Sequence, residues 1–236
     1  MKKFFIVMGI IAGGIIIIAS LFFLFKNNLN YSPLVPQEGC ELIQTNPGDK
    51  KIDLVFFTDG ATYDRVKEYA DFLLNVSPYK DNAEKFNIYY AGETKCGVYE
   101  DAIFCYDKAL LKKATACPND YVIVLVDKPQ EMRSSFYIQV ASINIHQPKS
   151  VFLHEFGHAF ANLADEYVPS PIPTGSQNCQ KKCSFFDAYI NIECFQGCSD
   201  ADYYRSSEAS VMRTLKTEEY HTVNEELIKE KLKNYE

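Results

Sequence analysis

Hydrophobic and polar positions divide the chain into an uncharged first segment and a longer part in which short apolar runs alternate with helical patterns. The first segment contains no charged residue from Phe4 to Phe25. A helix needs about 20 apolar residues to cross a bilayer, and a cleaved signal peptide has a shorter apolar region. We therefore expect a retained membrane anchor at residues 1–26, and a cleaved signal segment is the alternative.

After residue 50 the pattern alternates between buried strands and amphipathic helices. Strands are predicted at 52–57, 86–91 and 121–126, a further extended stretch at 136–145, and helices at 63–74, 99–116 and 223–233. This alternation predicts an α/β fold with a mixed, largely parallel sheet. The stretch 27–49 is rich in Asn, Pro and Gly and lacks periodicity, so a stalk is expected there.

The pattern changes after Tyr167. Residues 168–178 contain three prolines and a glycine, so regular structure is expected to stop there. An irregular, cysteine-rich segment follows it. We predict one domain at 50–236, with an upper α/β part at 50–167 and a smaller disulfide-rich part at 168–236.

Charge restricts the partners and orients the anchor. The net charge is −7, from 24 basic and 31 acidic side chains. The sequence has no run of basic residues that could bind along a phosphate backbone, so nucleic acid is not expected as a partner. Lys2 and Lys3 precede the apolar run and only Lys26 follows it closely. The positive-inside rule therefore places the N-terminus in the cytoplasm and the domain outside it.

The cysteines favour the same compartment. All eight follow the predicted anchor, and an even number is typical of an oxidising environment. The matched spacings within 179–183 and 194–198 predict nested disulfides, Cys179 to Cys198 and Cys183 to Cys194. A structural zinc ion held by these four thiolates is the alternative. The sequence leaves the pairing of four others open: Cys40, Cys96, Cys105 and Cys117.

The segment HEFGH, from His154 to His158, carries the candidate chemistry. Two histidines four residues apart lie on one face of a helix and can hold one zinc ion. Glu155 is then placed to take a proton from a water that attacks a carbonyl. The alternative is an ordinary helix with two incidental histidines.

A catalytic zinc site needs a third protein ligand. Asp165 and Glu166 are the nearest candidates, and Glu193 is a more distant one. On a straight helix Asp165 would lie about 10 Å beyond His158, too far to reach the ion. The helix must therefore end, and Asn162 is a residue that readily adopts the left-handed conformation.

The segment HEFGHAFANLADEY resembles the zinc-binding signature of the IgA peptidase family, a branch of the metzincin-like zinc peptidases. Three further pieces match in the family's order: KIDLVFFTDGAT, CFQGCSDADYYRSSEASVMR and NEELIKEKL. Together the pieces span most of the chain from Lys51 to Tyr235. The resemblance implies an α+β metzincin-like fold and one catalytic zinc ion.

The resemblance also implies a methionine turn below the metal, and Met212 is the residue that matches it. A plain core methionine is the alternative role for Met212. Tyr204 and Arg205 precede this turn and are candidates to contact the substrate or the transition state, although packing is the alternative for both. IgA is not carried over as a substrate, because a fold family does not fix what a cleft accepts.

These features predict a membrane-anchored, extracytoplasmic, zinc-dependent endopeptidase that acts on protein or peptide substrates. The alternative is a membrane-tethered binding or adhesion domain that is catalytically inactive and keeps the metal for stability. The presence of Glu155 speaks against this alternative, since a binding domain has no need of a general base.

Overall fold

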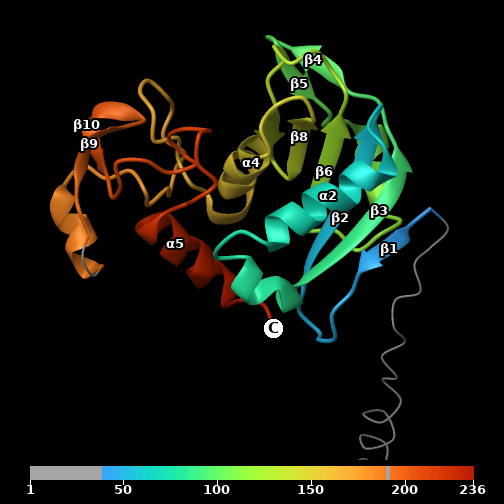
Figure 1. Ribbon diagram of the computed structural model, residues 1–236, viewed down its shortest axis with the longest axis horizontal. Coiled ribbons are helices and arrows are strands. Elements are labelled where there is room, and N and C mark those ends of the chain that lie inside the picture. The colour runs from blue at the N-terminus through green and yellow to red at the C-terminus, as the bar shows by residue number, and fades with distance from the viewer. Residues whose placement is uncertain (1–38, 190–191) are drawn as a thin grey trace, which may run out of the picture. The chain divides into compact units, whose positions relative to one another are not determined.

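In the computed structural model, which describes residues 39–189 and 192–236, a six-stranded sheet lies at the centre of the unit Pro36–Glu236 (Figure 1). Its strand order is β1-β3-β2-β6-β8-β7. The four inner strands are parallel to one another: β3 (Phe86–Glu93), β2 (Ile52–Asp59), β6 (Tyr121–Val126) and β8 (Val140–Asn144). The edge strands β1 (Glu41–Gln44) and β7 (Ser135–Tyr137) are antiparallel to their neighbours. The predicted α/β class with a largely parallel sheet is confirmed.

Both faces of the sheet are covered, which explains why its central strands are apolar along their whole length. Leu54 and Phe56 of β2 pack against α2 (Tyr63–Leu74), α4 (Ser150–Ala161) and α5 (Thr222–Leu232). Val55 and Phe57 point the other way, toward α3 (Lys108–Ala114). All four of these β2 side chains are fully buried.

Helix α4 is held in place by aromatic packing on the side of the core. Phe156 packs edge-on against Tyr79, with 5.4 Å between the ring centroids, and Tyr79 packs in the same way against Tyr220 at 5.9 Å. The Tyr220 hydroxyl donates a hydrogen bond to the backbone carbonyl of Leu153. These contacts fix the rotation of α4, and therefore the direction of the side chains on its other face.

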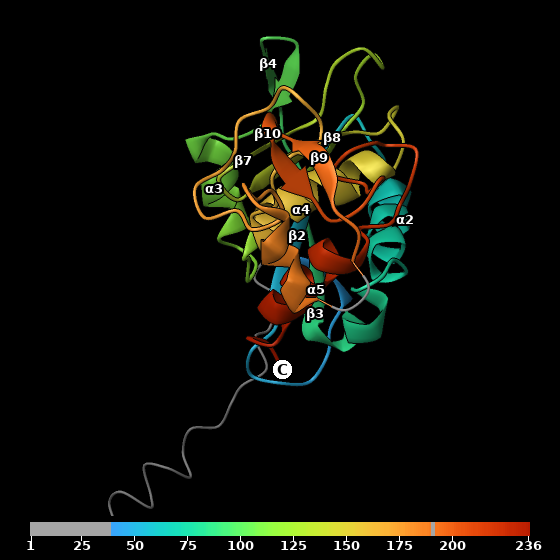
Figure 2. The same ribbon diagram turned by 90° about the vertical axis from the view of Figure 1, so that its left-hand side faces the viewer.

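The segment after Tyr167 is largely irregular and lies beyond α4, on the side away from the sheet (Figures 1 and 2). It contains the 3₁₀ helix η2 (Cys183–Ala188) and the hairpin of β9 (Phe195–Cys198) and β10 (Asp200–Arg205). The nested disulfides Cys179–Cys198 and Cys183–Cys194 are both present, as predicted. The other pairs are Cys40–Cys117 and Cys96–Cys105, so every cysteine of the chain is oxidised.

The predicted helix at 99–116 is wrong in its first half. Residues there form the hairpin of β4 (Gly97–Tyr99) and β5 (Ala102–Phe104), closed by the Cys96–Cys105 disulfide. Helix α3 begins only after Asp107, whose side chain accepts a 2.7 Å hydrogen bond from the amide of Leu110. The cap and the disulfide determine these boundaries, and the helical spacing of apolar residues does not reveal either.

Two further expectations need correction. The expected stalk at 27–49 contributes β1 to the sheet and is tied to it by the Cys40–Cys117 disulfide. The extended stretch at 136–145 is split between β7 and β8, because Ile138 adopts a positive φ of 58° at the turn between them. The first difference depends on pairing with the distant strand β3, and the second on a tight turn at Ile138, and local composition specifies neither.

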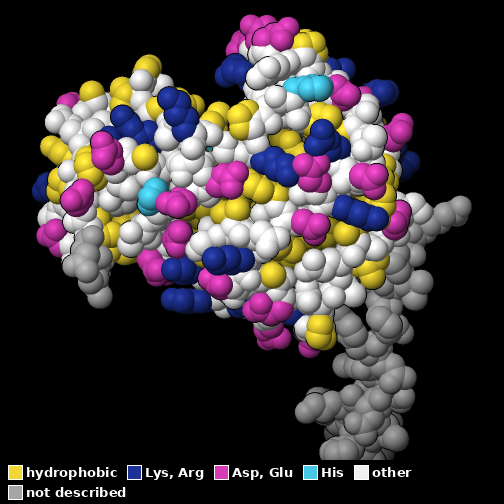
Figure 3. Space-filling view, viewed as in Figure 1, with side chains coloured by type: hydrophobic (Ala, Val, Ile, Leu, Met, Phe, Trp, Pro, Cys, Tyr) yellow, Lys and Arg dark blue, Asp and Glu magenta, His cyan; other side chains and the backbone are white. Residues whose placement is uncertain are grey.

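The predicted anchor at residues 1–26 lies outside the described residues. Within the described part, no helix is long and apolar enough to cross a membrane. On the face seen in Figure 3, basic side chains lie among acidic ones over most of the surface, so that face has no large area of a single charge.

The 3₁₀ helix η1 (Lys80–Lys85) leads into β3, and a backbone hydrogen bond joins the C-terminus to the start of the sheet. The amide of Glu236 donates to the carbonyl of Lys50, 2.9 Å away, just before β2 begins. The last residues of the chain are therefore part of the domain's packing.

Candidate metal centre

The two histidines of HEFGH lie on the face of α4 that is opposite its aromatic packing. Their imidazole rings are 4.7 Å apart between centroids, and their Nε2 atoms are 3.1 Å apart. His154 is buried, with 9% of its surface exposed. The helical repeat of 3.6 residues brings two side chains four positions apart to the same face. The structure therefore brings His154 and His158 together as the spacing predicts.

Helix α4 ends at the residue predicted to reverse the chain. Asn162 adopts the left-handed conformation, with φ of 53° and ψ of 37°. Its amide donates to the carbonyl of His158, and the amide of Leu163 donates to the carbonyl of Gly157, which together close the last turn. The Asn162 side chain donates a 3.1 Å hydrogen bond to the carbonyl of Thr174. The predicted reversal at Asn162 is confirmed.

The reversal brings Asp165 back beside the histidines. Its Oδ1 lies 3.0 Å from Nε2 of His154 and 3.3 Å from Nε2 of His158. Ser170 donates a 2.5 Å hydrogen bond to the other carboxylate oxygen, Oδ2. Among the described residues, these three side chains are the one group of His, Cys, Asp or Glu whose ligand atoms converge, all within 4.8 Å of one another.

The donor atoms in this group fit a divalent cation. Nδ1 of His154 lies 3.0 Å from the carbonyl oxygen of Val211, and Nδ1 of His158 lies 2.6 Å from that of Leu163. A carbonyl only accepts, so each Nδ1 carries the proton and each neutral ring presents a lone pair at Nε2. Oδ1 of Asp165 is buried and has no hydrogen-bond partner within the described part of the chain. Three lone pairs that converge without a donor suit the nitrogen and oxygen ligands of zinc.

The electrostatics of the centre favour a positive charge at this position. Burial alone would raise the pKa of Asp165, but its contacts with His154, His158 and Ser170 hold that pKa well below the usual value. Burial opposes a charge on His154, yet the nearby carboxylates of Asp165 and Glu155 raise its pKa. The protein thus concentrates negative charge at the position where a cation would lie.

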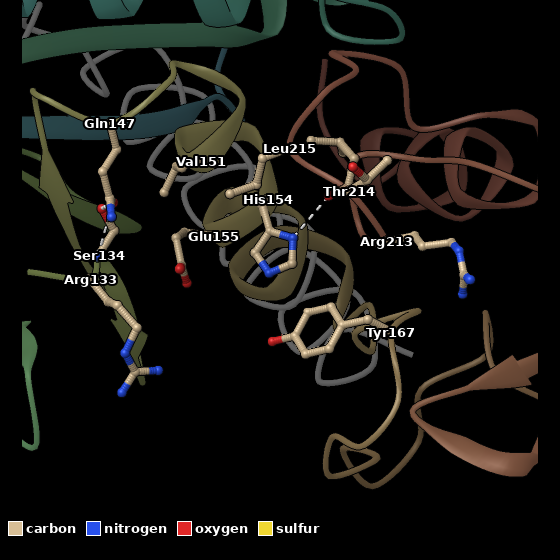
Figure 4. A pocket seen from close by; sticks show the side chains of 11 residues that line it. Arg133, Ser134, Gln147, Val151, His154, Glu155, Tyr167, Arg213, Thr214 and Leu215 are labelled. Atoms are coloured by element: carbon tan, nitrogen blue, oxygen red, sulfur yellow. Dashed lines mark hydrogen bonds between the residues drawn. The ribbon is translucent and has the colours of Figure 1, made fainter. Parts of the chain in front are cut away.

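Glu155 projects into a cavity of about 310 Å³ beside His154 (Figure 4). Burial raises the pKa of its carboxyl, and the neighbouring His154, His158 and Arg133 lower it again in part. The cavity walls come from α4, from the segment that contains Arg133, and from the turn that follows Met212. A carboxylate in this position can exchange a proton with a group bound in the cavity.

Met212 lies below α4 in a turn. It is fully buried, and Arg213 and Thr214 both donate backbone hydrogen bonds to the carbonyl of Ser210. A Cβ at Gly157 would come within 2.8 Å of the Met212 sulfur, so Met212 packs closely against the backbone of α4 at this position. The turn that carries Met212 therefore lies directly against the helix of the two histidines.

Glu166, the alternative ligand, is engaged elsewhere. It is fully buried and its carboxylate accepts hydrogen bonds from Ser210 at 2.5 Å, Asn224 at 3.0 Å and Asn178 at 3.2 Å. Its amide also donates to the carbonyl of Met212. Burial raises the pKa of Glu166 against the effect of these bonds. Glu166 thus joins the ligand loop to the methionine turn and to α5, and Glu193 is exposed and outside the histidine group.

Tyr204 and Arg205 do not line the cavity beside Glu155. Tyr204 exchanges backbone hydrogen bonds with Gln180, and the Arg205 guanidinium donates to the carbonyls of Gln196 and Gly197 at 2.6 Å. Both residues hold the β9–β10 hairpin together. The structure supports their packing role and does not bring them to the candidate site.

Sequence reasoning missed Tyr167, which follows the motif directly. Its ring stacks on that of His154, with 6.4 Å between centroids and an interplanar angle of 17°. Burial and the charge of Asp165 raise the pKa of the Tyr167 hydroxyl to about 12, so it stays protonated and remains a donor. Its hydroxyl points into the same space as Glu155 (Figure 4). Its position two residues after a predicted ligand was the signal available.

Comparison with known protein families relates this part of the chain to a peptidase family. The family described as IgA Peptidase M64 matches residues 102–185, a segment that includes all of α4 and the loop to Asp165. Residues 102–185 are therefore similar to the IgA peptidase family. The match covers roughly a third of the chain and supports a peptidase, a hydrolase of peptide bonds. No curated protein matches the chain.

Proposed function

We propose that this chain is a zinc-dependent endopeptidase, anchored in a membrane by residues 1–26, whose catalytic domain lies outside the cytoplasm. The observation that carries the proposal is the convergence of Nε2 of His154, Nε2 of His158 and Oδ1 of Asp165 beside the carboxylate of Glu155. The similarity of residues 102–185 to the IgA peptidase family supports the reaction class.

The three converging side chains would hold one zinc ion. Bound zinc supplies Lewis-acid chemistry, which polarises a scissile carbonyl and acidifies water. The chain's own residues do the remaining work. Val211 and Leu163 fix the two imidazoles through their carbonyls, and Ser170 fixes the carboxylate of Asp165. This support from neighbouring groups raises the basicity of the ligands and sets their orientation.

Glu155 acts as the general base and then as the general acid. Its carboxylate accepts a proton from the attacking water and later gives it to the departing amine. Burial raises the pKa of Glu155 above its usual value, which helps the carboxyl keep the proton between these two steps. Tyr167 presents a protonated hydroxyl in the same space, where it can donate to the negatively charged oxygen of the tetrahedral intermediate.

The extracytoplasmic location is supported by the cysteines and by the first residues of the sequence. All eight cysteines form disulfides in the described unit, which suits an oxidising compartment. The uncharged run from Phe4 to Phe25 follows two lysines, as in an anchor with a cytoplasmic N-terminus. Fractionation of cells that express the full chain tests this: the protein should stay with membranes after a carbonate wash and be digested by protease added outside.

The decisive experiment compares Glu155→Gln with the wild-type full chain. The variant should keep its zinc, measured by mass spectrometry of the metal, and lose cleavage of a broad peptide library. His158→Ala should lose both, whereas His146→Ala, which alters an exposed histidine paired with Asp127, should lose neither. Cleavage by Glu155→Gln at the wild-type rate would refute the mechanism. Zinc without cleavage by the wild type would favour the catalytically inactive binding domain.

A further inference from the structure

The cavity beside Glu155 contains two arginines that form no close ion pair with a described carboxylate, although the charge of Arg133 lowers the pKa of Glu155. Arg133 and Arg213 are two of only four arginines in the chain, and both line this cavity. Neither belongs to any of the ion pairs that the described residues form. In contrast, Arg65 on the outer face of α2 pairs with Glu68 at 2.6 Å. Unpaired arginines are unexpected in a chain with a net charge of −7.

Each of these arginines is held in place and keeps free donors. The backbone of Arg133 bonds to that of Asp101 and Ile103, and its Nη2 donates to the carbonyl of Glu100 at 3.1 Å. Nη1 of Arg213 donates to the carbonyl of Glu166 at 2.9 Å. A guanidinium has five N–H donors, so most donors of each remain available for a ligand.

The two guanidinium groups flank the catalytic side chains. In Figure 4 they lie on opposite sides of the row formed by Glu155, His154 and Tyr167. A peptide bound across this row would pass one arginine on each side of its scissile bond. Glu155 is the one carboxylate among the residues described as lining the cavity.

The side-chain amide of Gln147 adds a neutral hydrogen-bond donor to the cavity wall. Oε1 of Gln147 accepts hydrogen bonds from the amide of Ser134 at 3.2 Å and from its hydroxyl at 2.7 Å. This fixes which way the Gln147 amide points and directs its Nε2 donors away from Ser134. Nε2 makes no hydrogen bond to any described residue. The wall beside Glu155 therefore presents donors and positive charge to a ligand.

We propose that this cavity selects peptides that carry a carboxylate group close to the scissile bond, with Arg133 and Arg213 as the specificity-determining residues. The inference rests on the proposed function, because it names the substrate class of the same site. Arginine binds a carboxylate through two parallel hydrogen bonds, which combines affinity with a fixed orientation. The cavity volume of about 310 Å³ suits one side chain. The carboxylate is either that of an Asp or Glu side chain or that of a peptide C-terminus.

The test uses the full chain and a library of eight-residue peptides blocked at both ends, in which each position is Glu in one member and Gln in its matched partner. Wild-type protein should cleave the Glu member with a kcat/KM about tenfold higher than the Gln member at one or two positions, the factor that one charge-assisted hydrogen bond supplies. Arg133→Gln or Arg213→Gln should bring this ratio close to one at the peptide position that the substituted arginine contacts. Arg65→Gln, which removes a paired arginine outside the cavity, should leave the ratio unchanged.

A second set of peptides distinguishes the two sources of the carboxylate. Peptides that end in a free carboxylate should be cleaved faster than their amidated partners only if the cavity binds a peptide C-terminus. Preference for an internal Glu without any effect of amidation assigns the cavity to an acidic side chain. A charge reversal, Arg133→Glu, should instead favour peptides with Lys at the position read by Arg133.

A binding measurement keeps this inference separate from the proposed function. Immobilised full-length Glu155→Gln protein should retain Glu peptides over their Gln partners, and Arg133→Gln or Arg213→Gln in the same background should remove this retention. Absence of cleavage by the wild type together with selective retention would contradict the peptidase and support the carboxylate site. Equal retention of Glu and Gln peptides, or a kcat/KM ratio that neither arginine variant changes, would overturn the inference.

Discussion

The side chain of Glu166 and the hydroxyl of Ser210 are joined by a 2.5 Å hydrogen bond across 44 positions of the sequence. This bond links the loop that carries Asp165 to the turn that carries Met212, and the carbonyl of Val211 in the same turn holds His154. The candidate metal ligands His154 and Asp165 are therefore positioned by a network that includes the turn at Met212. The two adjacent acids, Asp165 and Glu166, consequently have different roles.

Substitution of the two acids separates these roles. Asp165→Asn should lower zinc affinity by more than about 100-fold, beyond the loss seen when only a supporting hydrogen-bond partner is removed, because it replaces a charged ligand. Glu166→Gln should retain zinc and lose about 1–3 kcal/mol of unfolding free energy, since its buried partners Ser210, Asn178 and Asn224 lose charge-assisted bonds. Competition with a chelator and urea denaturation measure the two effects. The reverse pattern would make Glu166 the ligand.

The end of α4 gives a second prediction. Asn162 has a positive φ of 53°, a conformation that costs most residues about 1–2 kcal/mol. Asn162→Val should therefore destabilise the protein by about that amount and weaken zinc binding, because Asp165 no longer returns to the histidines. Asn162→Gly loses the same side-chain bond to Thr174 but adopts this conformation freely, so it should keep its zinc. Equal zinc affinity of the Val and Gly variants would show that the reversal does not position Asp165.

Local sequence determined the elements that were predicted well. Helix α2 at 63–74 and strand β6 at 121–126 match their predicted bounds, because helical spacing and a continuous apolar run are local properties. Most of the hairpin β4–β5 was predicted as part of a helix, since its apolar residues fit helical spacing and the Cys96–Cys105 disulfide that closes it cannot be read from that spacing. The periodicity of apolar residues does not show which cysteines pair.

The candidate site divides in the same way. The spacing of His154 and His158 and the conformational freedom of Asn162 are local, and both predictions agree with the geometry. Arg133 and Arg213 lie far apart in the sequence and meet the site only through the fold. No spacing rule brings such residues to one cavity, so the two arginines of the cavity could not be predicted.

The nested disulfides should differ in their effect on the metal. Ser199, next to Cys198, donates a 2.5 Å hydrogen bond to the carbonyl of Asp165. The Cys179–Cys198 disulfide therefore lies beside the loop that carries Asp165. Removing Cys179–Cys198 by a double alanine substitution should cost about 3 kcal/mol of stability and also weaken zinc binding. Removing Cys183–Cys194 should cost a similar amount of stability without a change in zinc affinity. Thermal unfolding and zinc titration of both variants, after mild expression at low temperature, provide the comparison.

The last prediction concerns acid stability and depends on Asp59 at the end of β2. Its side chain is 4% exposed and accepts hydrogen bonds from Lys95 at 2.9 Å and from the amide of Cys96 at 3.1 Å. Burial alone would raise its pKa, but these bonds and the charge of Lys128 lower it below the usual 3.8.

Because the folded pKa is depressed, the carboxylate stabilises the protein above the unfolded pKa, and this contribution is lost as pH falls from about 3.8 through the lower folded value. Asp59→Asn should therefore cost about 2 kcal/mol at pH 7 and progressively less below pH 4. Urea denaturation at a series of pH values measures this difference, with both proteins in a His158→Ala background so that metal loss in acid does not contribute. A difference that stays constant down to pH 2 would show that the charge of Asp59 does not stabilise the fold.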